Sequence, residues 1–113
     1  MNRILVSAAL LAAFTAAVHI VAGGSDIAGP LLASTLAAEP RLTLYAVWHM
    51  GSVMLVFSAI ALGIGSLPGC AQGTRALVLF ISLLWCAFGL VFLAIIVIHL
   101  GSGSLFTLPQ WVL

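Results

Sequence analysis

The chain has 113 residues, of which 65% are hydrophobic and 4% are charged. Soluble domains carry roughly 25% charged residues, so this composition excludes a soluble globule and a disordered chain. It also excludes a nucleic-acid-binding protein, which needs clustered Lys and Arg side chains, because the chain has no lysine. The sequence therefore predicts an all-α integral membrane protein that forms one domain over residues 1–113.

Three apolar stretches have the length of about 20 residues that a helix needs to cross the hydrocarbon core of a bilayer. They cover residues 4–22, 42–62 and 76–100, and each is apolar on all sides. Thr74 is expected to cap the third stretch. Residues that break helices are expected to separate the stretches: Gly23-Gly24, Gly29-Pro30, Glu39-Pro40, Gly63, Gly65, Pro68-Gly69 and Gly73. The sequence therefore predicts three transmembrane helices.

The first stretch has a second interpretation. Arg3, the apolar run Ile4–Phe14 and the small residues Thr15–Ala17 together resemble a secretory signal peptide. A helix over residues 4–22, however, rises about 28 Å, which is enough to cross the bilayer. We therefore expect this segment to be a retained span.

The arginines indicate an orientation, because Lys and Arg near the ends of spans favour the cytoplasmic side. Arg3 and Arg75 lie on one side of the expected spans, and Arg41 lies on the other. This bias predicts a bacterial inner-membrane protein with a cytoplasmic N-terminus. The first loop, residues 23–41, and the tail, residues 101–113, would then face outward.

Both outward-facing segments are apolar enough to contact the membrane surface. Pro30 suits the first position of a helix, and the run Leu31–Ala38 predicts a short interfacial helix. Residues 105–113 would rise only about 14 Å as a helix, which is too short to cross. They predict a C-terminal interfacial segment or the start of an incomplete fourth span.

Small and weakly polar residues mark where two helices approach each other in lipid. At about 100° per residue, each of the first two spans has one such face with a histidine on it. We therefore expect these spans to pair with His19 and His49 turned into the contact. The two faces consist of Ala8, Ala12, Thr15, His19 and Ala22, and of Tyr45, His49, Ser52, Val56, Ala59 and Gly63.

Three antiparallel spans would bring His19, His49 and His99 to the outer half of the membrane. Imidazole is the commonest protein ligand of transition metals, and an ionisable residue inside a span is by default a candidate for function. We therefore expect a copper or zinc site formed by His19 and His49, completed by His99 or by Asp26 or Glu39 from the first loop.

Other functions remain open. The histidines would serve only as interhelical hydrogen-bonding groups in an accessory or structural subunit of a larger membrane complex. Haem ligation between His19 and His49 is less favoured, because the small faces suit close approach. A small transporter would need a homo-oligomer, since three spans enclose no pathway. Tyr45 and Trp48 are expected to be interface anchors, and no motif indicates a catalytic residue.

Overall fold

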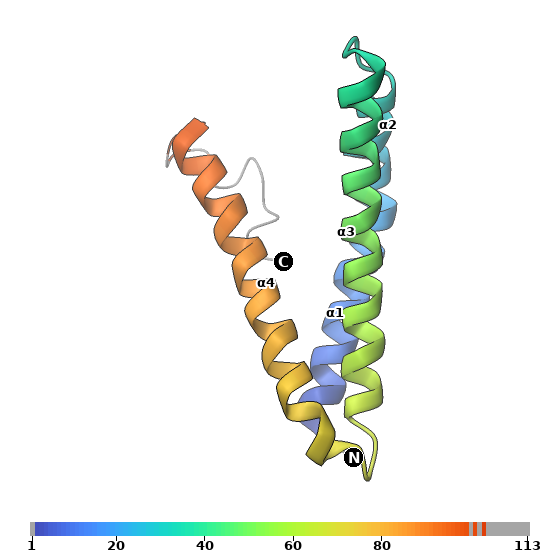
Figure 1. Cartoon of the computed structure of the whole chain (residues 1–113), viewed down its shortest axis with the longest axis vertical. Helices are drawn as coiled ribbons and strands as arrows, with labels where there is room; N and C mark the ends of the chain where they lie inside the picture. The colour runs from blue at the N-terminus through green and yellow to red at the C-terminus, as the bar shows by residue number, and fades with distance from the viewer. Residues whose placement is uncertain (1, 100, 102, 104–113) are drawn as a thin grey trace. The chain divides into compact units, whose positions relative to one another are not determined.

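The computed structural model describes residues 2–99, 101 and 103, and this part of the chain is all-helical without strands (Figure 1). The chain divides into two compact units between Gln72 and Gly73, and each unit is described by itself. The elements in chain order are α1 (Arg3–Gly23), the π-helical turn η1 (Gly24–Ala28), α2 (Gly29–Leu32), α3 (Ala38–Gly65) and α4 (Ala71–His99).

Three helical segments of the described chain are long and apolar enough to cross a membrane: Arg3–Leu32, Ala38–Gly65 and Gly73–Ile98. The prediction of an all-α chain with three such helices is confirmed. The expectation of a single domain stays a prediction, and the C-terminal segment 105–113 lies outside the described residues.

The first helix is longer than expected. Gly23 and Gly24 do not end it, because η1 and α2 continue the helical path of α1 as far as Leu32. The interfacial helix expected over Leu31–Ala38 is therefore wrong: residues 33–37 form the turn and bend that join the first helix to α3. Glycine lowers helix propensity by only about 1 kcal/mol, which the packing of these residues against α3 offsets.

The other two helices also begin earlier than expected. Pro40 lies in the first turn of α3, where a missing backbone N–H costs nothing because that group has no helical partner. Gly63 lies inside α3, which ends at Gly65. Thr74 lies inside α4 and is not its N-cap. In each case, a residue interpreted as a boundary is accommodated within a helix.

The predicted pairing of the first two helices is confirmed, since α1 packs along α3. Figure 1 shows the two helices running side by side as a hairpin closed by residues 33–37. At the open end, the backbone N–H of Asn2 donates to the carbonyl of Ser66 at 3.0 Å. The Asn2 side chain also caps α1 by accepting from the backbone N–H of Ile4 at 3.1 Å. We call this antiparallel pair the α1–α3 hairpin.

Small side chains fill the contact of the α1–α3 hairpin, and large apolar side chains point outward. Phe14 and Phe57 remain 60% and 64% exposed, an arrangement opposite to that of a soluble core. The buried hydroxyls do not lack partners, because each bonds to a carbonyl of its own helix. The buried residues of α1 and α3 are Ala12, Thr15, Ala16, Ser52, Ser58, Leu62 and Gly65.

Candidate functional site

His19 and Trp48 form the most specific contact between α1 and α3. The imidazole of His19 stacks on the indole of Trp48, with ring centroids 4.8 Å apart and ring planes 16° apart. The His19 Nε2 also lies 3.4 Å from the backbone carbonyl oxygen of Trp48. His19 is half-buried, and the prediction that it faces the other helix is confirmed.

The carbonyl partner selects one tautomer of a neutral His19 ring. A carbonyl oxygen only accepts hydrogen bonds, so Nε2 of a neutral His19 must carry the proton and donate it. The other ring nitrogen, Nδ1, is then the one that can accept a hydrogen bond or bind a metal. The Trp48 carbonyl also accepts from the Ser52 hydroxyl at 3.3 Å. His19 is therefore engaged with the backbone of α3.

Glycines provide the space for these two rings. A Cβ atom on Gly51 would lie 3.8 Å from Nε2 of His19, and a Cβ atom on Gly23 would lie 3.6 Å from Nε1 of Trp48. Each ring therefore rests on the backbone of the opposite helix where no side chain intervenes. The Trp48 Nε1 is buried there and has no hydrogen-bond partner among the described residues.

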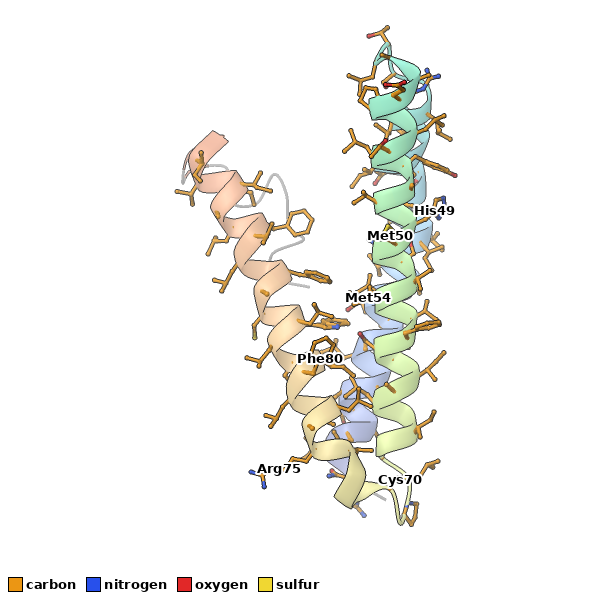
Figure 2. All side chains as sticks on the ribbon, viewed as in Figure 1. His49, Met50, Met54, Cys70, Arg75 and Phe80 are labelled. Atoms are coloured by element: carbon orange, nitrogen blue, oxygen red, sulfur yellow. The ribbon has the colours of Figure 1, made fainter. Side chains whose placement is uncertain are left out.

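His49 does not turn into the helix contact, and this part of the prediction is wrong. Its side chain is exposed on α3 (Figure 2). There it packs edge-on against Tyr45 and Trp48, with ring centroids 4.5 and 4.9 Å apart. The face of α3 that meets α1 contains Trp48 and Gly51 instead, so it is rotated about the helix from the expected face. Of the residues expected on that face, Ser52 is buried.

The remaining predicted ligands are Asp26, Glu39 and His99. Asp26 is exposed in η1, where the Ser25 hydroxyl lies 3.0 Å from its carboxylate. Glu39 is exposed in the first turn of α3. His99 is the last residue of α4, in the other compact unit, and its side chain is outside the described set. Across the described part of the chain, no three His, Cys, Asp or Glu side chains come together as a metal site.

The sequence interpretation missed the contact of Trp48 with His19, because the position of Trp48 also suited an interface anchor. It lies three residues before Gly51, and the pair shares the α3 face that meets His19. The sequence did contain one signal for this contact: Trp48 and Gly51 are three residues apart, so they lie on one face of a helix.

Comparison with protein-family models, curated proteins and solved structures returns no match for this chain. The geometry of the described residues therefore carries the functional argument.

We predict that Gly51→Leu destabilises the α1–α3 hairpin by about 1–3 kcal/mol, because the new side chain would displace the His19 ring. The matched control is Gly63→Leu on the same helix, where nothing lies within 4 Å of the added Cβ atom. The measurement is the free energy of unfolding in mixed detergent micelles. Equal effects of the two substitutions would contradict the proposed seat of His19.

Proposed function

We propose that this chain is an integral membrane protein with a cytoplasmic N-terminus and three crossing helices. The three candidate windows bury only 17%, 17% and 11% of their residues inside the chain. Water does not tolerate so much exposed apolar surface on a monomer, whereas a bilayer does. Arg3 lies at the start of the first span and Arg75 near the start of the third. These two arginines support the orientation, because Lys and Arg near the ends of spans favour the cytoplasmic side.

Within the membrane, we propose a structural role for the protein as an accessory subunit of a larger assembly. The observation that carries this proposal is the exposure of His49 on α3, outside the α1–α3 contact. An ionisable side chain within a membrane helix usually faces protein or a water-filled cavity, because lipid offers it no hydrogen bond. A partner helix that covers His49 and Tyr45 would supply that environment.

His19 and His49 differ in their contacts within the chain, and this difference supports the same proposal. His19 already has a carbonyl partner within the chain, so it serves the stability of the α1–α3 hairpin. His49 makes ring contacts but no hydrogen bond among the described residues. Of these two histidines, His49 is therefore the one that is available to an external group.

We predict that the chain resists alkaline carbonate extraction and migrates in native gels of mildly solubilised membranes above its own mass of 11.7 kDa. His49→Leu is expected to release it from this assembly, because the polar contact to the partner is lost. Met50→Leu changes the exposed neighbouring residue at similar volume and should leave the assembly intact. Migration of the wild-type chain as a monomer, or identical behaviour of both variants, would contradict the subunit role.

We propose copper or zinc binding as the second candidate function, and the unengaged ring nitrogens of His49 favour it. A single imidazole does not hold such an ion, since these metals take three or four protein ligands. His99, Asp26, Glu39 or the Nδ1 atom of His19 would have to complete the site, within one chain or between copies.

For this candidate function, elemental analysis of detergent-purified protein is expected to find copper or zinc in a fixed ratio to the protein. His49→Ala should abolish binding, whereas Met50→Leu should retain it. Protein that holds no metal after loading with either ion would overturn this second function and leave the structural proposal unaffected.

A further inference from the structure

The π-helical turn η1 interrupts the helical path Arg3–Leu32, the longest one among the described residues. Its five residues, Gly24–Ala28, lie between α1 and α2, and the N–H of Gly29 bonds to the carbonyl of Gly24 five residues earlier. A π turn closes its hydrogen bond over one residue more than an α turn, and such turns are rare. The segment therefore contains one surplus residue near the C-terminal end of an otherwise α-helical path.

The surplus residue sets which side of the segment faces α3. In a regular α-helix, Ala28 would lie about 140° around the axis from Gly23, because each residue advances by about 100°. The wider turn brings Ala28 back toward the Gly23 side. Ala28 is accordingly 5% exposed, and α2 keeps contact with α3. The π register is thus what keeps this end of the first helix packed.

Pro30 explains why the turn is wide at this place. In an α-helix, a proline ring clashes with the carbonyl four residues earlier, which here belongs to Asp26 in the turn. Proline also lacks the N–H that either register would use, so a change of register loses no hydrogen bond at Pro30. The ring favours the π turn sterically, while the missing N–H lowers the cost of leaving it.

Trp48 contacts the start of this turn. Besides its contact with Gly23, its Cη2 atom lies 3.9 Å from the position of a Cβ atom on Gly24. A change of register alters the path of the backbone directly after Gly24, under the indole. The other end of the segment joins residues 33–37, which are not helical and can absorb a rotation. Arg41 bonds to the Ser34 carbonyl there at 3.2 Å.

We propose that η1 is a conformational switch, in which the segment Gly24–Leu32 rotates between the π register and an α register. The π register packs Ala28 on α3, and the α register turns it outward by about 100°. Pro30 biases the switch toward the packed state, and the indole of Trp48 holds that state. The moving part is the loop end of the α1–α3 hairpin, so the switch changes the surface offered there.

The test is fluorine NMR of the full chain carrying 6-fluorotryptophan, whose fluorine sits on the Cη2 atom that faces Gly24. Trp85→Phe and Trp111→Phe leave Trp48 as the single probe. Pro30→Ala is expected to increase the population of a second Trp48 resonance several-fold, because the clash that favours the π turn is removed. Deletion of Asp26 removes the surplus residue and should give one sharp resonance.

Pro40→Ala is the matched control, since Pro40 lies in the first turn of α3 and should leave the Trp48 spectrum unchanged. The switch is overturned by a single Trp48 resonance that Pro30→Ala leaves unmoved in protein of undiminished helix content. If the deletion variant does not fold, the comparison of Pro30→Ala with Pro40→Ala still decides between the two results.

Discussion

The stacking of His19 on Trp48, with each ring resting on a glycine of the opposite helix, is the contact on which the hairpin depends. Lipid chains are as apolar as leucine, so burial of apolar surface does not drive helices together in a bilayer. Close packing and polar contacts must do so. The stacked rings and the 3.4 Å approach of the His19 Nε2 to a carbonyl supply both at one place.

The same constraint explains how residues of different size are distributed over the hairpin. Ala12, Ala16 and Ser58 are buried between the helices, because small side chains let the backbones approach. Phe14 and Phe57 point outward, where lipid or a partner protein would cover them in the proposed function. The histidines divide along the same line: His19 serves the internal contact, and His49 lies on the surface from which a partner is recognised in the proposed function.

Three apolar runs of about 20 residues were sufficient to predict three helices, because a helix needs a run of that length to cross a bilayer. The small face of the first helix was also predictable, since Ala12, Thr15 and His19 follow its period. The facing side of α3 was not. The spacing of polar residues favoured His49 as the residue of α3 that faces α1. In the structure, Trp48 and Gly51 are the residues that contact His19. The metal ligands stay a prediction. Ligands on separate helices converge only if each helix turns the right face toward the others, and the local sequence does not encode which face that is.

The ends of the helices were the other feature that the sequence did not predict correctly. Glycine and proline were interpreted as breakers at Gly23, Pro30 and Pro40, and all three lie within the helical path. Their effect depends on position: Pro40 meets the free first turn of α3, and Pro30 follows a turn with one extra residue. Only the packing of the neighbouring helix decides which of these outcomes a given glycine or proline produces.

Proton NMR of the protein in lipid nanodiscs tests the His19–Trp48 stack most directly. The stacked arrangement predicts cross-relaxation between the imidazole protons of His19 and the indole protons of Trp48, because the two ring centroids are 4.8 Å apart. The neighbouring pair Trp48 and His49, 4.9 Å apart on one helix, serves as the internal reference. Cross-peaks for the reference pair without any between His19 and Trp48 would contradict the account.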